Sequence, residues 1–328
     1  MKDNIKVSII CVTYNQEKYI RKTLDSFLMQ ETDFDYEIIV HDDASTDETK
    51  KIIEDYIRKY PEKIKAIFEK ENIYSQDKSV FAVTVKEAKG EYIAVCDGDD
   101  FWTNKYKLQK QYDVLEKYKN CSCCVHKVAT CDEEEHVLEK VKPSSKYGLN
   151  KDTLLTQDEF AKLLFSKAST KCPFQTSSYF FRKSVLDNAD NFNWSIERRK
   201  YVDANKLKIF LLTGDIFYIN EIMSTYRIWA INSLSYKSKT NSDYLGFEMY
   251  NLIKEDLEFD KYTNYKYHEY INVEFYRYLL FSNEININKE RNKELLKIHK
   301  LNILEMIRSV GIKRILVYIF KKINNISK

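Results

Sequence analysis

Three carboxylates stand within four positions, directly after a short apolar run at residues 92–96: Asp97, Asp99 and Asp100. An apolar run of this length predicts a buried strand, whereas three neighbouring acids at its end repel one another. A divalent cation would relieve that repulsion, because Mg²⁺ and Mn²⁺ take oxygen ligands and bridge to substrate phosphates. The alternative is a solvated acidic turn. The sequence favours a metal site here.

The elements before this cluster alternate between strands and helices. Strands are expected at residues 7–13, 36–41, 64–68 and 91–96, with helices between them and another at 105–118. This alternation predicts a mostly parallel sheet that is covered by helices on both faces. Ligands bind such sheets beyond the carboxyl ends of the strands. The turns at 13–15 and 42–45 should therefore meet the acidic cluster at one edge of the sheet.

Two of these turns also carry helix-capping patterns. Asn15 is positioned to cap the helix that follows it, and Ser45 with Glu48 has the spacing of a capping box. We expect Ser45 to act as a helix cap rather than to contact a ligand. Asp42 is expected to cap or orient the same loop.

Composition limits the classes of protein that remain. The 328 residues include 44% hydrophobic and 14% aromatic residues, which suits a globular protein with a sizeable core. A net charge of +3 argues against a molecule that binds nucleic acid by its overall charge. The seven cysteines are irregularly spaced, the first four residues are polar, and no apolar run approaches the roughly 20 residues of a membrane span. These features predict a cytoplasmic protein.

The second half of the chain is mixed and then helical. Thr156 and Glu159 have capping-box spacing; strands are expected at 176–181 and 216–219, and a helix at 203–213 that ends at Gly214. Long helical patterns begin near residue 241. We therefore expect a catalytic domain over 1–235 and a helical C-terminal region over 236–328. The cysteines and His126 between 121 and 131 lack the paired spacing of zinc sites, so this segment predicts a buried strand.

The ordered motifs VSIICVTYNQEKYI, EIIVHDDASTDET and AKGEYIAVCDGDDFWTNKYKLQKQ resemble those of family-2 glycosyltransferases with the glycosyltransferase A fold. QTSSYFFRKSVL and TGDIFYINEIMSTYRI support the same family, and the resemblance covers residues 5–235. It implies an inverting hexosyltransferase that moves a sugar from a nucleotide-sugar to an acceptor hydroxyl of a glycan, glycolipid or glycoprotein. It also implies a divalent cation, Mn²⁺ or Mg²⁺. UDP is the nucleotide expected from family habit, with GDP and dTDP left open.

The resemblance also implies roles for single residues. Asp97 and Asp99 match the DxD pair, with Asp99 as the main metal ligand and Asp97 near the metal or the ribose. Asp100 is expected at the nucleotide-sugar, in contact with the metal shell or the acceptor. Asp43 resembles the carboxylate that accepts a hydrogen bond from the base. The remaining expected contacts to the nucleotide come from the first turn, where Tyr14 is suited to lie against the base, and Thr13 and Asn15 either hold the base or only fix the turn.

Inversion needs a general base that takes the proton of the acceptor hydroxyl. Asp203 opens an apolar helical segment as the family's base does, and the alternative is that it only caps its helix. Many relatives carry a histidine shortly after a Tyr-Arg pair, where this chain has Trp229. Arg227 could still reach a phosphate. Trp102 either lines the acceptor site or belongs to the core.

The end of the chain leaves three alternatives open. Residues 307–328 contain no acid, six basic residues and several apolar ones. Such a segment can lie on the anionic inner face of a membrane, pack on the preceding helices, or join two subunits. Two other functions also remain open: a nucleotidyltransferase, although the first turn lacks a glycine-rich phosphate loop, and a non-catalytic module that binds nucleotide-sugar or glycan.

Overall fold

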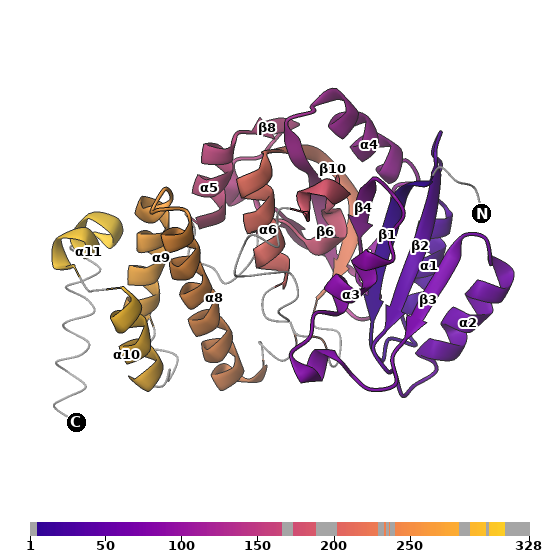
Figure 1. The fold of residues 1–328 in the computed structure, drawn as a ribbon, viewed down its shortest axis with the longest axis horizontal. Coiled ribbons are helices and arrows are strands. Elements are labelled where there is room, and N and C mark those ends of the chain that lie inside the picture. The colour runs from indigo at the N-terminus through magenta and orange to yellow at the C-terminus, as the bar shows by residue number, and fades with distance from the viewer. Residues whose placement is uncertain are drawn as a thin grey trace. The chain divides into compact units, whose positions relative to one another are not determined.

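The structure is a computed structural model, and it describes residues 5–165, 173–187, 202–228, 240–281, 289–299 and 302–311, together with 233 and 236. One sheet contains all the strands of this part of the chain, in the order β3-β2-β1-β4-β9-β6-β10-β5, with β7 paired to β6 and β8 paired to β10 (Figure 1). The strands are β1 (Ile5–Thr13), β2 (Asp35–Asp42), β3 (Ile64–Phe68), β4 (Tyr92–Val95), β5 (Phe101–Trp102), β6 (Cys121–Cys131), β7 (Val137–Lys142), β8 (Thr153–Leu155), β9 (Phe180–Arg182) and β10 (Asp215–Arg227).

The first four strands form the parallel half of the sheet that the sequence predicts. β1 lies between β2 and β4, and β2 pairs with β3, all in parallel register. The rest is mixed, because β9 runs antiparallel to both β4 and β6 while β10 runs parallel to β6. The parallel arrangement brings the carboxyl ends of β1, β2 and β4 to one edge, as expected.

Helices connect the strands of the sheet. They are α1 (Ile20–Leu28), α2 (Thr49–Lys59), α3 (Val80–Lys86), α4 (Lys107–Lys117), α5 (Gln157–Phe165) and α6 (Val202–Thr213), with short 3₁₀ turns η1 (Tyr74–Gln76), η2 (Ser145–Tyr147), η3 (Thr176–Ser178) and η4 (Lys183–Val185).

The core of the sheet follows the alternation of side chains along β1. Val7, Ile9 and Cys11 are fully buried in one apolar cluster with residues of α1, α2 and α4. Because successive side chains of a strand point to opposite faces, Ser8 and Ile10 face the other side. There α3 contacts β1 and β2, and its Thr84 hydroxyl lies 2.8 Å from His41 Nδ1 of β2. Both faces of the parallel half are therefore covered.

Several expected elements differ in extent. The strand expected at 216–219 is β10, which runs from Asp215 to Arg227 and contains register shifts between Ile219 and Ser224. The strand expected at 176–181 begins only at Phe180, after the turn η3. The cysteine-rich segment is the buried strand β6, as predicted, and its cysteines are free thiols.

Two of the three predicted helix caps are wrong. Asn15 does not cap α1, which begins at Ile20 after Tyr19. Ser45 does not cap α2 either, because that helix begins at Thr49 after Glu48 and has no side-chain cap. The capping box at Thr156 is confirmed: its amide donates to Glu159 Oε2 at 2.9 Å, and the Glu159 amide donates to Thr156 Oγ1 at 3.3 Å.

The chain divides into two compact units. The first contains residues 1–160 and 172–230, and the second contains residues 161–171 and 231–328. The described helices of the second unit are α8 (Ser242–Tyr262), α9 (His268–Phe281), α10 (Lys289–Ile298) and α11 (Ile303–Val310), which agrees with the predicted helical region. The proposed domain boundary at residue 235 stays a prediction.

The aromatic side chains of the second unit form part of its core. Phe259 stacks on Tyr267 with ring centroids 5.7 Å apart, and both contact Phe165 from the end of α5.

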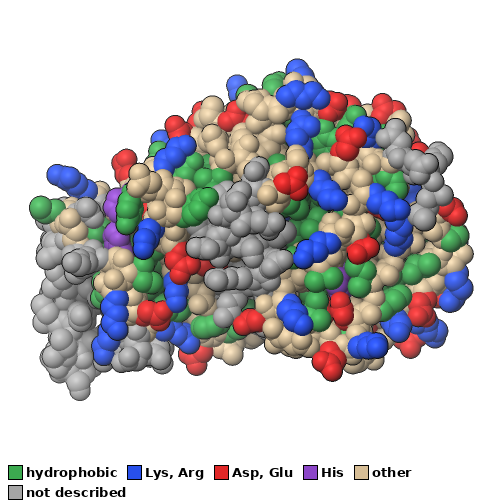
Figure 2. Space-filling view, viewed as in Figure 1, with side chains coloured by type: hydrophobic (Ala, Val, Ile, Leu, Met, Phe, Trp, Pro, Cys, Tyr) green, Lys and Arg blue, Asp and Glu red, His purple; other side chains and the backbone are tan. Residues whose placement is uncertain are grey.

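Within the described residues, no helix combines the length and apolar character needed to cross a bilayer. On the face that Figure 2 shows, lysines and arginines are interspersed with acids, as the small net charge suggests.

Candidate functional site

The acidic turn after β4 is held against β1 and α1. The amide of Gly98 donates to the Val12 carbonyl at 2.9 Å. Thr23, a buried residue of α1, places its hydroxyl 2.9 Å from the Gly98 carbonyl and 2.7 Å from the Asp100 carbonyl. A Cβ on Gly98 would lie 2.8 Å from the Thr13 Cβ, so only glycine fits this approach. The turn therefore has a fixed backbone.

The three acids of this turn have different environments. Asp97 and Asp99 are partly exposed, whereas Asp100 is only 1% exposed. Asp100 Oδ1 accepts a hydrogen bond from the Arg227 amide at 3.0 Å, and Asp100 Oδ2 is buried without a hydrogen-bond partner. Burial raises the pKa of Asp99 and, together with the charges of Asp99 and Asp97, raises the pKa of Asp100 well above its usual range. Asp100 thus has a buried oxygen without a hydrogen-bond partner, next to two further carboxylates. A bound cation would stabilise the negative charge of such a group.

The geometry suits a cation that is shared with a ligand better than a closed protein cage. Among the described residues, the one set of three ligating side chains whose ligand atoms lie within 4.8 Å of one another is Asp132, Glu134 and His136, and it does not include the acidic turn. Asp97 and Asp99 would supply two carboxylates. Mg²⁺ is commonly bound by one or two carboxylates plus substrate phosphates, so this donor set fits a nucleotide-bridging ion.

The turn after β1 is tied to the turn after β2. The Asn15 amide donates to Ser45 Oγ at 2.8 Å, and Asn15 Oδ1 accepts from the Thr46 amide at 2.8 Å. Ser45 Oγ also donates to Asp42 Oδ1, so Asp42 orients this loop. Asn15 adopts a left-handed backbone with φ of 52°, a conformation that asparagine tolerates better than most residues. The contacts that Asn15 makes here fix the turn.

The neighbouring residues of the first turn differ in exposure. Thr13 is 1% exposed, and its hydroxyl donates to Gln16 Oε1 at 2.7 Å, so its contacts also fix the turn. Tyr14 is 46% exposed at the same edge of the sheet. An exposed ring in this place is available to stack on a planar ligand.

Asp43 holds a second loop at the same edge. Its Oδ1 accepts from the Ile73 amide at 2.7 Å and its Oδ2 accepts from the Tyr74 amide at 3.1 Å. The Asp43 amide in turn donates to the Thr13 carbonyl at 3.0 Å. Asp43 is 2% exposed, and each carboxylate oxygen keeps a further acceptor position. Sequence reasoning did not predict that this carboxylate binds the loop at 72–74.

Trp102 and Arg227, for which the sequence leaves a contact with ligand open, are both buried. Trp102 is 2% exposed, lies 4.7 Å from the Phe27 ring and donates through Nε1 to the Ser177 carbonyl at 3.2 Å, so it belongs to the core. Arg227 is 1% exposed, and its guanidinium binds the Asp99, Asp132 and Glu133 carbonyls and the Glu135 carboxylate. The expected reach of Arg227 to a phosphate is therefore wrong for this arrangement.

The predicted general base lies at the margin of what the structure describes. Asp203 is the second residue of α6, in the first turn of that helix. Its side chain lies outside the described residues, as do Trp229 and most of the basic tail. Their predicted roles stay predictions.

Sequence reasoning missed two polar residues that shape the site. Thr23 lies on the apolar face of α1 with Ile20, Leu24 and Phe27, and a polar residue among apolar ones was the available signal. Gln16 contacts Thr13 and also donates to the Asp99 carboxyl, which lowers the pKa of Asp99 against the effect of burial. No pattern in the sequence marks Gln16.

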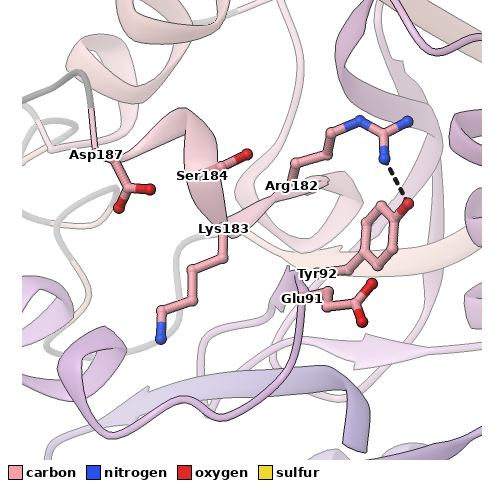
Figure 3. A pocket seen from close by; sticks show the side chains of 6 residues that line it. All are labelled: Glu91, Tyr92, Arg182, Lys183, Ser184 and Asp187. Carbon is pink, nitrogen blue, oxygen red and sulfur yellow. Dashed lines mark hydrogen bonds between the residues drawn. The ribbon is translucent and has the colours of Figure 1, made fainter.

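A hollow of about 480 Å³ lies at the opposite edge of the sheet, beside the beginning of β4 and the end of β9 (Figure 3). It is lined by charged and polar side chains: Glu91, Tyr92, Arg182, Lys183, Ser184 and Asp187. Figure 3 shows the Arg182 guanidinium turned toward the Tyr92 hydroxyl, to which it donates a hydrogen bond at 2.5 Å. This hollow contains none of the predicted site residues.

The chain is similar in sequence to known proteins. An uncharacterized protein of Mycobacterium tuberculosis is 32% identical over 227 residues, which are 67% of this chain and 58% of that protein. The chain thus spans less than two thirds of the length of this relative. The GalNAc(5)-diNAcBac-PP-undecaprenol beta-1,3-glucosyltransferase of Campylobacter jejuni is 27% identical over 269 residues, 80% of this chain and 78% of the relative.

The fold is also found among solved structures. The crystal structure of S. aureus TarS 1–349 in complex with UDP superposes with a TM-score of 0.60 at 19% identity, covering 94% of this chain and 82% of that one. This likeness confirms the expected glycosyltransferase A fold. Residues 8–188, which include most of β1, the acidic turn and β9, match the family model described as glycosyl transferase family 2. The chain therefore belongs to glycosyl transferase family 2.

Proposed function

We propose that this chain is a metal-dependent inverting glycosyltransferase that moves a sugar from a nucleotide-sugar, with UDP as the first candidate nucleotide, to an acceptor hydroxyl. The observation that carries the proposal is the meeting of the acidic turn with the turns after β1 and β2 at one edge of the sheet. Support for UDP comes from TarS, which is similar in fold and was solved with UDP. Family membership supports sugar transfer over nucleotidyl transfer.

Each site residue has a proposed role. Asp99 and Asp97 bind a divalent cation, Mn²⁺ or Mg²⁺, with Asp97 also near the ribose. Asp100 supports the nucleotide-sugar end of the site from its buried position. Asp43 accepts a hydrogen bond from the base through a free lone pair while it holds the 72–74 loop. Tyr14 lies against the base, and Thr13 and Asn15 shape the turn that carries Tyr14.

The chemistry proposed for this site is a direct displacement. The Asp203 carboxylate takes the proton of the acceptor hydroxyl, and the acceptor oxygen forms a bond to the anomeric carbon on the face opposite the leaving group. The bond from that carbon to the diphosphate oxygen breaks, and its electron pair leaves with the nucleoside diphosphate. When bound, the cation would neutralise charge that develops on the diphosphate. The protein's part is to hold donor, acceptor and proton acceptor in line.

The acceptor is proposed by class. The Campylobacter relative is named for a substrate linked to undecaprenol diphosphate, which supports a lipid-linked glycan as one acceptor class. Free glycans and proteins are the other classes. The basic C-terminal segment would then contact an anionic inner membrane face, or join two copies of the chain. Co-sedimentation with anionic liposomes separates these alternatives, because a protein that stays in the supernatant and elutes as a dimer contradicts the membrane contact.

Calorimetric titration tests the donor side of the proposal. UDP, GDP and dTDP are titrated into the protein with Mn²⁺ and with chelator. We expect one nucleotide, UDP first, to bind only with metal, and Asp99→Ala to abolish that binding. Lys117→Ala, on the far end of α4, is the control and should bind as the wild type. Equal binding with and without metal would contradict the role of the acidic turn.

Turnover tests the catalytic side. Hydrolysis or transfer with the UDP-sugar that binds best is compared between the wild type and Asp203→Ala. We expect the variant to keep nucleotide binding and lose turnover by about 10²- to 10⁴-fold. Unchanged turnover would remove Asp203 from the mechanism. A wild type that binds nucleotide-sugar but turns over no acceptor would favour a non-catalytic binding module.

A further inference from the structure

Arg227 is the last residue of β10, and its side chain is buried beside the acidic turn. Its Nε donates to the Asp99 carbonyl at 3.1 Å. The side chain is 1% exposed, so this contact is shielded from water. A buried arginine is stable only when its donors are satisfied, and the guanidinium hydrogen bonds of Arg227 go to backbone carbonyls and a carboxylate.

The contact is reciprocal. While the Arg227 side chain binds the backbone of Asp99, the Arg227 amide donates to the side chain of Asp100 at 3.0 Å. Two neighbouring residues of the acidic turn are thus joined to one residue of β10. Asp99 is bound through its backbone carbonyl, and Asp100 through its side-chain carboxylate. This pairing restrains both the position of the Asp99 peptide and its rotation about the turn.

The other donors of Arg227 anchor it in place. Nη1 donates to the Glu133 carbonyl at 2.9 Å, and Nη2 donates to Glu135 Oε1 at 2.9 Å. The second Glu135 oxygen pairs with Lys22 of α1. The guanidinium carbon also lies 4.4 Å from the centre of the Tyr19 ring, a cation–π contact from the same helix. The guanidinium is therefore fixed by the β6–β7 turn and by α1.

We propose that Arg227 is the positioning residue of the acidic turn: through the Asp99 carbonyl it sets the direction in which the Asp99 and Asp97 carboxylates meet a divalent cation. This inference rests on the metal-dependent function proposed above. Arg227 contacts neither ligand nor metal in this assignment. It acts as outer-shell groups act on metal ligands, where loss of such a group lowers metal affinity by about 10- to 100-fold.

Arg227→Lys tests the assignment because lysine keeps the positive charge but lacks the planar fork that reaches several acceptors. UDP affinity is measured by calorimetry over a series of Mn²⁺ concentrations. We expect the midpoint Mn²⁺ concentration to rise about 10- to 100-fold in the variant. At saturating Mn²⁺ the affinity for UDP should return to that of the wild type, which a general loss of structure would not give.

Arg182→Lys is the matched control. Arg182 also donates to a backbone carbonyl, that of Leu115, and lies at the opposite edge of the same sheet. We expect it to lower thermal stability without moving the Mn²⁺ midpoint. If Arg227→Lys does not fold, Glu135→Gln serves instead, because it weakens the anchor of the guanidinium and leaves Arg227 present. It should raise the midpoint by a smaller factor.

The outcomes are distinct. A wild type whose UDP binding is independent of Mn²⁺ refutes the metal-dependent function itself. If the wild type needs Mn²⁺ and a folded Arg227→Lys has an unchanged Mn²⁺ midpoint, the positioning role alone is refuted. If Arg227→Lys is unfolded, an unchanged Mn²⁺ midpoint in Glu135→Gln refutes the same role. A loss of UDP affinity that saturating Mn²⁺ does not restore also refutes it, because such a loss indicates a structural role only.

Discussion

The backbone amide of Asn15 donates to the hydroxyl of Ser45 across 2.8 Å, and this bond joins the turn after β1 to the turn after β2. The Ser45 hydroxyl in turn donates a hydrogen bond to Asp42 Oδ1. The serine therefore links two loops of the candidate site, although its sequence pattern predicts a helix cap. Substitution of Ser45 can distinguish a link between loops from a helix cap.

Ser45→Ala should weaken nucleotide binding while α2 stays intact. The variant removes one bond between the loops, which corresponds to about 1 kcal/mol. We expect UDP affinity to fall by a few-fold to about tenfold, with far-ultraviolet circular dichroism unchanged. Thr153→Ala, on β8, is the control, because the Thr153 hydroxyl donates to the Lys151 carbonyl of its own segment. Loss of helical signal in Ser45→Ala would instead restore the capping interpretation.

Asp43→Asn should loosen the 72–74 loop. An amide group would place an N–H donor opposite the amide of Ile73 or Tyr74, where the carboxylate now accepts both. Loss of one charged hydrogen bond corresponds to about 1.5–3 kcal/mol of stability. Denaturant unfolding and UDP calorimetry measure the two effects together. Asp113→Asn, at an exposed position on α4, should change neither; equal stability of both variants would show that Asp43 does not hold the loop.

Lys107→Met should change how stability depends on pH. Lys107 is fully buried, with its amine 4.0 Å from the centre of the Trp102 ring, and burial lowers its pKa from the usual 10.5 to about 7. Between these values the unfolded chain binds a proton that the folded protein lacks. Stability should therefore rise with pH from about 7 to 10.5, by up to about 1.4 kcal/mol per pH unit.

Methionine at position 107 removes that rise and should make the protein more stable near pH 7. Lys110→Met, three residues further along α4 and partly exposed, should leave the rise in place. Urea unfolding at a series of pH values measures both variants. A rise that persists in Lys107→Met would mean that Lys107 keeps its proton in the folded protein.

Gly98→Ala should disturb the acidic turn. The added Cβ would lie 2.3 Å from Gln16 Oε1 and 2.8 Å from the Thr13 Cβ. We expect a loss of about 0.5–3 kcal/mol in stability and a weaker Mn²⁺-dependent affinity for UDP. Gln16→Ala in the same chain removes the shorter contact and should recover part of the loss. A fully stable Gly98→Ala with normal UDP binding would show that the turn is free to move.

The sequence predicted the parallel half of the sheet well for a physical reason. Each strand there is an apolar run followed at once by polar turn residues, and the register of parallel strands brings those turns to one edge. The sequence alone therefore places Asp97 and Asp43 at one edge of the sheet. The capping pattern at Ser45 failed because α2 begins only at Thr49, and because the Ser45 hydroxyl oxygen, which would accept from the helix in a cap, accepts from the Asn15 amide instead.

The contacts that were missed join residues far apart in the chain. Arg227 looked available for a phosphate because the sequence does not show that the β6–β7 turn surrounds it. The 72–74 loop likewise reaches Asp43 only in the folded sheet. Local patterns report burial and turns, whereas pairing between distant loops depends on strand order, which periodicity does not encode.

The bond between Asp100 and Arg227 closes a loop of 127 residues. Contacts this distant in sequence form slowly, because the chain between them loses conformational entropy before the contact contributes any stability. During synthesis the acidic turn emerges long before its partner on β10, and the segment from β1 to β4 leaves the ribosome without the residue that completes it. The proposed nucleotide site is therefore expected to be among the last parts of the first unit to form, because a chain that stops short of β10 lacks the residue that holds the acidic turn.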